Sequence, residues 1–148
     1  MAVTDLEELR KIYEDTNTIA VVGASGDPNK AAHTIPRYLQ RQGFRILPVN
    51  PRGGEILGEK AFERLTDIPE SVDVVDVFRP SEETPEVARD AVKVGAKVLW
   101  LQEGIESEEA ERIASEGGLK VVMNRCMGHT HYQLDLGPGP DRPEPQGT

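Results

Sequence analysis

The sequence is poor in cysteine and contains no long hydrophobic run. Its one cysteine, Cys126, excludes an internal disulfide and a metal site built from several thiolates. No apolar stretch approaches the roughly 20 residues that a membrane-spanning helix needs. The acidic N-terminus lacks the apolar core of a signal peptide. We therefore expect a cytoplasmic protein with no membrane partner.

Positive charge is also scarce. The chain has 17 Lys and Arg residues against 26 Asp and Glu residues, which gives a net charge of −9 at pH 7. The overall field of such a molecule does not attract nucleic acid, so we expect no nucleic-acid partner. Any anionic ligand must be held by local donors. The length of 148 residues is that of one domain, which argues against a multi-domain enzyme.

The end of the chain differs in composition from the rest. Residues 137–148 contain four prolines and three glycines and no large apolar residue. Such a segment cannot bury enough surface to offset the entropy of ordering it. We therefore predict a disordered tail over 137–148 and a folded domain over 1–136.

Short apolar runs alternate with helical patterns through the domain. Five runs have the length and β-branched composition of strands, and residues 60–62 suggest a sixth, edge strand. The five runs are 18–22, 44–49, 72–78, 97–101 and 119–123. Helices are predicted over 5–15, 32–42, from Thr84 to Gly95 and from Ser107 to Gly117, with Thr4, Thr84 and Ser107 as N-caps.

This alternation predicts an α/β domain of the Rossmann-like, doubly wound type. Its mainly parallel sheet should have five to six strands, with helices on both faces. We expect the first three strands to form one set, after which the chain crosses to the far side of the sheet. Ligands of such folds bind beyond the carboxyl ends of the strands.

The segment after the first strand offers an anion site. Gly23, Ala24 and Ser25 close the strand, and Lys30 precedes a helix that starts near His33, so all five are candidate cofactor-binding residues. A helix N-terminus and a lysine together attract phosphate. The alternative is a tight turn without a ligand.

The segment after the second strand reads Asn50-Pro51-Arg52. NAD enzymes usually carry a carboxylate here to bind the ribose hydroxyls, and this chain has a cation instead. Arg52 is therefore a candidate for a phosphate near a ribose, with NADP as a competing ligand. Arg52 as a solvated loop residue is the alternative.

Three further strand ends carry candidate residues. Phe78 can shape an apolar slot, while Arg79 can stack on a ring, meet a phosphate or sit on the surface before the next helix. Segment 102–105 offers backbone amides. Cys126 follows the last strand near His129 and His131, but no third group orients them, so we predict neither a catalytic residue nor a metal site.

Several segments together resemble the stand-alone CoA-binding protein family, which is similar to the nucleotide-binding domain of the succinyl-CoA synthetase α subunit. The most specific are V-N-P at 49–51, V-F-R-P at 77–80 and W-L-Q-x-G-I at 100–105. The other matching segments are 19–25, 36–39, 47–48, 74–76, 98–99 and 121–126. The resemblance covers about residues 5–136.

The resemblance implies that CoA lies across the strand ends, in contact with four groups of residues. These groups are Gly23, Ala24, Ser25 and Lys30 at the pyrophosphate, Asn50, Pro51 and Arg52 at the ribose 3′-phosphate, Phe78, Arg79 and Pro80 at the adenine, and Gln102, Gly104 and Ile105 at the pantetheine. The chain departs from the family at Asn124, where Asp is frequent, and in the loop 127–131. The phosphohistidine domain of the synthetase is not expected in 148 residues.

The leading hypothesis is a single domain that binds CoA or an acyl-CoA without catalysing a reaction, as a carrier, a sensor or the partner of another subunit. The first alternative is an enzyme, either an NADP-dependent reductase or an acyl transferase that uses Cys126. The second is an interaction domain whose nucleotide pocket is vestigial.

Overall fold

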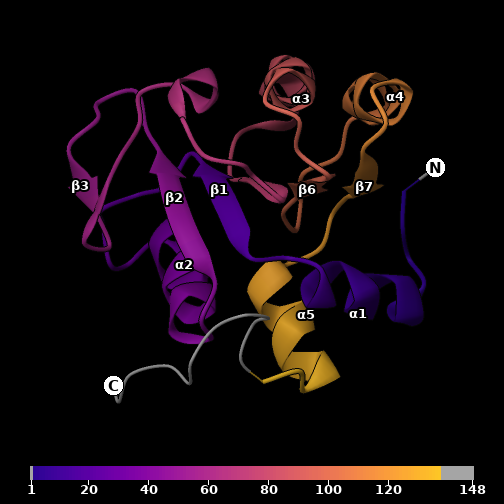
Figure 1. Ribbon diagram of the computed structural model, residues 1–148, viewed down its shortest axis with the longest axis horizontal. Helices are drawn as coiled ribbons and strands as arrows, with labels where there is room; N and C mark the ends of the chain where they lie inside the picture. Colours follow the sequence, from indigo (N-terminus) through magenta and orange to yellow (C-terminus); the bar gives the residue numbers. More distant parts are fainter. Residues whose placement is uncertain (1, 138–148) are drawn as a thin grey trace.

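A five-stranded parallel sheet forms the centre of the computed structural model, which describes residues 2–137 (Figure 1). The strand order is β2-β1-β5-β6-β7. In chain order these strands are β1 (Thr18–Val22), β2 (Arg45–Val49), β5 (Val74–Val77), β6 (Val98–Leu101) and β7 (Lys120–Val122). Every residue of β5 and β6 is buried, because helices cover both faces of the sheet.

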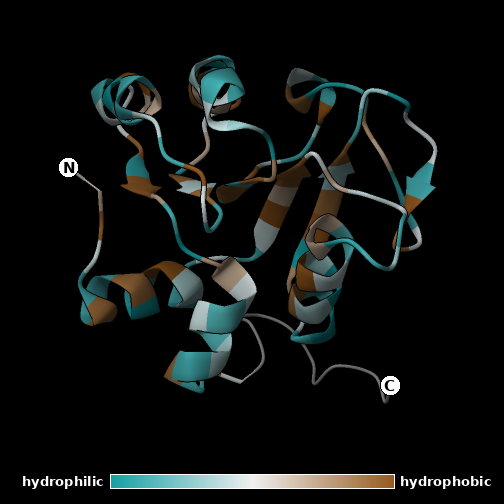
Figure 2. Ribbon diagram, turned by 180° about the vertical axis from the view of Figure 1, so that it is seen from behind, coloured by the Kyte–Doolittle hydropathy of each residue, from teal (hydrophilic) through white to brown (hydrophobic). Residues whose placement is uncertain are grey.

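Five α-helices form the two outer layers. They are α1 (Leu6–Glu14), α2 (Ala31–Arg41), α3 (Thr84–Lys93), α4 (Glu108–Glu116) and α5 (Met127–Leu134). Helices α3 and α4 cover one face of the sheet, and α1, α2 and α5 cover the other (Figure 1). Figure 2 shows the hydrophobic strands between these layers. Successive β5 residues Val74 and Val75 enter the two separate hydrophobic clusters, so the predicted Rossmann-like α/β fold is confirmed.

The predicted edge strand at 60–62 is reduced to one residue beside β2. Phe62 forms a parallel bridge with Val49, and its N–H donates to the Pro48 carbonyl at 2.9 Å. The residues before it pair with each other instead, as the antiparallel hairpin of β3 (Glu55–Ile56) and β4 (Glu59–Lys60). The expected set of three strands before the crossing is therefore not formed. Only β1 and β2 precede it, and β5 pairs with the other side of β1.

The start of α1 lies one residue later than the sequence predicts. Asp5, and not Thr4, is the N-cap, and its carboxylate accepts a hydrogen bond from the Glu8 N–H at 3.2 Å. An Asp is as good a cap as Thr, so the pattern alone does not decide between adjacent candidates. The predicted cap of α4 is confirmed, since Ser107 Oγ accepts from Ala110 N–H at 3.0 Å.

Thr84 is the first residue of α3 rather than its cap. A 3₁₀ turn, η2 (Ser81–Glu83), precedes the helix, and the Thr84 hydroxyl donates to the Ser81 carbonyl at 2.7 Å. A second 3₁₀ turn, η1 (Leu65–Asp67), lies between β4 and β5. Helix α3 therefore starts with its N-terminus fixed close to the carboxyl end of β5.

Helix α5 replaces the loop expected after the last strand. Cys126 is its N-cap, with Sγ accepting from the His129 N–H at 3.4 Å. The Tyr13 hydroxyl, from α1, donates to the Met127 carbonyl at 2.6 Å and holds the two helices together. The sequence of this helix has few apolar residues at helical spacing. Its stability must therefore come mainly from contacts with the rest of the protein.

The outer strands are covered by the chain's own backbone. The Val3 N–H donates to the Val121 carbonyl of β7 at 2.7 Å, and Phe62 lies against β2 at the other side. No helix in residues 2–137 is long and apolar enough to cross a membrane. The predicted disordered tail, 137–148, lies outside the described residues except for Gly137.

Candidate functional site

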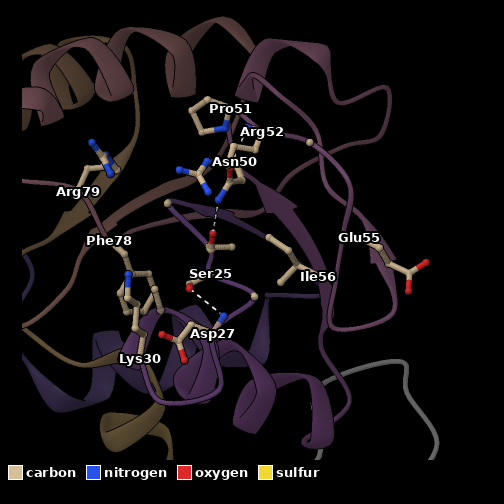
Figure 3. Close-up of a pocket in the computed structure, with 15 residues that line it drawn as sticks. Ser25, Asp27, Lys30, Asn50, Pro51, Arg52, Glu55, Ile56, Phe78 and Arg79 are labelled. Carbon is tan, nitrogen blue, oxygen red and sulfur yellow. Dashed lines mark hydrogen bonds between the residues drawn. The ribbon is translucent and has the colours of Figure 1, made fainter.

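A cleft of about 750 Å³ opens at the carboxyl ends of β1, β2 and β5 (Figure 3). Strand β1 lies between the other two, so the cleft is at the point where the strand order reverses. Fifteen residues from three loops and the β3 hairpin line it. They are Gly23, Ala24, Ser25, Gly26, Asp27, Lys30 and Ala32; Asn50, Pro51, Arg52, Gly53, Glu55 and Ile56; and Phe78 and Arg79.

Nine of the fourteen predicted site residues line this cleft. They are Gly23, Ala24, Ser25, Lys30, Asn50, Pro51, Arg52, Phe78 and Arg79. The sequence reasoning missed six others that do. Gly26 and Asp27 lie inside the segment already singled out, whereas Glu55 and Ile56 come from a hairpin that no local pattern had tied to the strand ends.

Gly23 makes the close approach of β1 to β5 possible. Its φ is +89°, and a Cβ at this position would lie 2.6 Å from the Phe78 carbonyl oxygen. The neighbouring backbones are joined by a hydrogen bond from Phe78 N–H to the Val22 carbonyl at 2.8 Å. The glycine is therefore required by the packing of the protein itself, before any ligand is considered.

Local hydrogen bonds shape the loop between β1 and α2. Ser25 Oγ accepts from the Asp27 N–H at 3.0 Å (Figure 3). An Asp27 carboxylate oxygen accepts from the Asn29 N–H at 2.9 Å. His33 Nδ1 donates to the Ser25 carbonyl at 2.8 Å. The predicted site residue His33 thus supports the loop from α2 and does not line the cleft.

Three cationic residues border the cleft, and one of them, Arg79, is paired with Glu83. In residues 2–137, neither Lys30 nor Arg52 forms an ion pair, and both side chains belong to exposed residues. Lys30 is also the N-cap residue of α2, and its side chain makes no capping hydrogen bond to that helix. These donors favour an anion, while Asp27 and Glu55 place negative charge on the same rim.

Asn50 ties two of the loops together. Its Nδ2 donates to the Ala24 carbonyl at 2.9 Å, and its Oδ1 accepts from the Arg52 N–H at 2.8 Å (Figure 3). Both polar ends of this side chain are therefore engaged within the protein. The amide holds the backbone of Arg52 in place and leaves its guanidinium available to a ligand.

The predicted residues of the fourth group, at the pantetheine, lie outside the cleft. Gln102 is buried, its Nε2 donates to Asp76 Oδ1, and its Oε1 accepts from the Met127 N–H at 3.4 Å. The Gly104 N–H donates to Asn124 Oδ1 at 2.6 Å. Ile105 packs against the α3–α4 side of the core, and Pro80 also lies outside the cleft lining.

Asp76 is a buried carboxyl group that the sequence reasoning did not single out. It lies in β5 with Val21 and Trp100 as its register partners, and it is fully buried. Its Oδ2 has no hydrogen-bond partner in the described part of the chain. Burial raises the pKa of Asp76 from 3.8 to about 7, against the opposing effect of the Gln102 hydrogen bond. The sequence signal that could have identified it is an acidic residue inside the valine-rich run 74–77.

Cys126 is poorly suited to act as a nucleophile. Burial raises the pKa of its thiol, although the backbone N–H groups of His129 and Gly128 oppose that shift. His129 contributes this N–H and not its imidazole. Both ring nitrogens of His131 are engaged, with Nε2 donating to the Gly137 carbonyl and Nδ1 accepting from the Tyr38 hydroxyl, each at 2.9 Å. Within residues 2–137, no three His, Cys, Asp or Glu side chains are grouped to hold a metal.

Comparison with known proteins identifies the family. A family model described as a CoA binding domain matches residues 17–132. This chain belongs to the CoA-binding domain family. The resemblance noted from the strand-end motifs is thereby confirmed.

Relatives of this CoA-binding domain include both a small protein and parts of larger enzymes. The uncharacterized protein YneT of Bacillus subtilis is 39% identical over 124 residues, which cover 84% of this chain and 92% of YneT. The α subunit of the ADP-forming acetate–CoA ligase II of Pyrococcus furiosus is 30% identical over 130 residues. That match covers 79% of this chain and 28% of the subunit, so the chain spans less than a third of this ligase subunit.

Solved structures share the same fold. A hypothetical protein from Pyrococcus horikoshii OT3 superimposes with a TM-score of 0.86 at 40% identity, covering 88% of this chain and 92% of that one. The cell-free ID.343 protein from Thermus thermophilus gives a TM-score of 0.84 at 42% identity, covering 88% and 99%. The fold of this chain thus also occurs in small proteins of nearly the same extent.

Proposed function

We propose that this domain binds CoA or an acyl-CoA in the cleft without catalysing a reaction. The observation that carries the proposal is the convergence of Lys30, Arg52 and the uncapped start of α2 on one cleft of a molecule whose net charge is −9. Membership of the CoA-binding domain family supports the choice of ligand. The unfavourable overall charge has to be overcome by these local donors.

The proposed pose follows the loops around the cleft. The pyrophosphate lies at segment 23–30, beside Lys30 and the first turn of α2. Most backbone N–H groups of this segment are engaged within the protein, so the lysine and the start of the helix are the donors on which this placement depends. The ribose 3′-phosphate lies at Arg52, and the adenine lies toward Phe78 and Arg79. The pantetheine leaves the cleft toward segment 102–105, in which the Gln102 side chain is already engaged by Asp76.

Replacing Arg52 with glutamine tests the placement of the 3′-phosphate. The affinity for CoA is expected to fall about tenfold or more, because a charge-assisted hydrogen bond is lost. The affinity for dephospho-CoA, which lacks that phosphate, should stay unchanged. Isothermal titration calorimetry with CoA, dephospho-CoA and NADP measures both effects. Arg41→Gln, at the far end of α2, is the matched control.

The placement of the 3′-phosphate at Arg52 is wrong if wild-type protein binds dephospho-CoA as tightly as CoA. Tighter binding of NADP than of CoA would favour the reductase instead. Absence of binding to all three ligands would favour a vestigial pocket. Each result is distinct in the same titration.

Replacing Cys126 with serine tests the absence of catalysis. Neither the wild type nor Cys126→Ser is expected to consume acetyl-CoA, since the raised pKa of the thiol leaves little thiolate at neutral pH. Free CoA released from acetyl-CoA is followed by mass spectrometry. Turnover by the wild type that disappears in the serine variant would establish a thiol mechanism and refute the non-catalytic role.

A further inference from the structure

A second pocket adjoins the cleft, and Arg79 lies between the two. This pocket has a volume of about 260 Å³ and lies between the strand ends, η1 and α3. Its apolar wall is made by Val22, Val49, Leu65 and Val87, and its charged residues besides Arg79 are Glu63, Arg64, Glu83 and Asp90. Gly23, Pro51 and Arg79 line both cavities.

The Arg79 side chain is held at two places along its length. Its stem passes directly over Gly23, since a Cβ on that glycine would lie 2.9 Å from Arg79 Cδ. Its guanidinium meets Glu83 through two hydrogen bonds, Nε to Oε1 at 3.0 Å and Nη2 to Oε2 at 3.0 Å. Two parallel bonds of this kind fix the plane of a guanidinium as well as its position.

Glu83 is itself held by the start of α3. It is the last residue of η2, and its N–H donates to the Pro80 carbonyl at 2.9 Å. It is the residue that directly precedes the first helical residue, Thr84, where a negative side chain is favoured by the helix dipole. The carboxylate is thus fixed relative to the backbone that carries Arg79.

The two bonds to Glu83 occupy one edge of the guanidinium, while the Arg79 side chain remains 45% exposed. Phosphate binds guanidinium edges through N–H groups, whereas aromatic rings stack on its faces. Lys30 and Arg52, which form no ion pair in residues 2–137, remain available for phosphate.

We propose that Glu83 is a positioning residue. Its carboxylate fixes the plane of the Arg79 guanidinium at the border of the second pocket. There the guanidinium stacks on the planar heteroaromatic ring of the ligand and does not bind a phosphate. The inference rests on the proposed function, in which the ligand is CoA and the ring is adenine. It decides between the two roles that the sequence left open for Arg79.

Glu83→Gln separates these two roles by the sign of its effect. A released guanidinium loses its fixed plane, so CoA affinity is expected to fall about fivefold, within the range of single stacking contacts. If Arg79 bound phosphate, removal of its competing carboxylate would instead tighten CoA binding and steepen the dependence on salt. Glu82→Gln, an exposed change of the same charge in η2, is the matched control and should match the wild type.

Arg79→Lys tests the same point with the charge retained. Stacking requires the planar group, so this variant should lose about as much CoA affinity as Glu83→Gln, and the double variant should lose no more than either. The stacking contact also lowers the ultraviolet absorbance of the bound adenine, and both variants should lose that signal. A mere structural role of Glu83 would leave the signal of the bound adenine intact.

The outcomes separate this inference from the proposed function. Wild-type protein that binds CoA, together with a Glu83→Gln variant that binds it equally or more tightly, overturns the inference alone. An Arg79→Lys variant with wild-type affinity does the same. A wild type that does not bind CoA refutes the proposed function and the inference with it.

Discussion

Replacing Asp76 with asparagine is expected to remove a large pH dependence from the stability of this domain. The folded-state pKa of Asp76 is about 7, against an ordinary value of 3.8 in the unfolded chain. The folded protein therefore binds more protons than the unfolded chain between these values. Its stability falls as the pH rises through this window and is constant above it.

Between pH 5 and pH 8 the free energy of unfolding of the wild type should fall by at most about 3 kcal/mol relative to that of Asp76→Asn. Urea denaturation of both proteins at each pH measures this difference. Asp67→Asn, which removes an exposed carboxyl from η1, serves as the control and should follow the wild type. The pKa of buried His131 is lowered by burial, but its contribution cancels because every variant retains it. Parallel pH profiles for the wild type and Asp76→Asn would contradict the prediction.

Gly23→Ala is expected to destabilise the protein by about 2–4 kcal/mol, because of strained backbone and overpacking. The positive φ of +89° disfavours any residue with a side chain, and the new Cβ would meet the Phe78 carbonyl oxygen at 2.6 Å. The two central strands would have to separate to accept it. Urea denaturation in the absence of ligand gives the size of the loss.

Gly26→Ala is the matched control in the same loop. A Cβ at Gly26 meets no atom within 4 Å, and its φ is outside the positive region. Its stability should stay close to that of the wild type. A Gly23→Ala protein of wild-type stability that had lost only its affinity for CoA would show that the glycine serves the ligand and not the fold.

The sheet could be predicted from the sequence because its strands are short valine-rich and leucine-rich runs with clear ends. Trp100, within one of these runs, is fully buried in β6. Helix α5 could not be predicted, because contacts from Tyr13 and Gln102 fix it rather than its own amphipathic pattern. The predicted edge strand is reduced to Phe62, because the residues before it pair with each other in the β3–β4 hairpin.

The candidate site was predictable where it depends on strand ends and unpredictable where it depends on side-chain direction. Parallel strands bring their carboxyl ends to one edge, so the loops at Gly23, Asn50 and Phe78 meet as expected. The inward orientation of Gln102 follows from Asp76 on the neighbouring strand, a partner 26 positions away. Local patterns contain no information on such a pair.

The covering of the two outer strands bears on how the protein behaves in concentrated solution. Open rows of N–H and C=O groups at the border of a sheet are templates on which further copies assemble into fibres. Here the Val3 N–H donates to the Val121 carbonyl of the outer strand β7. At the opposite border, Phe62 forms a backbone bridge with Val49 of β2. The first few residues and the hairpin thus protect the domain against self-assembly, although neither contributes a strand to the central sheet.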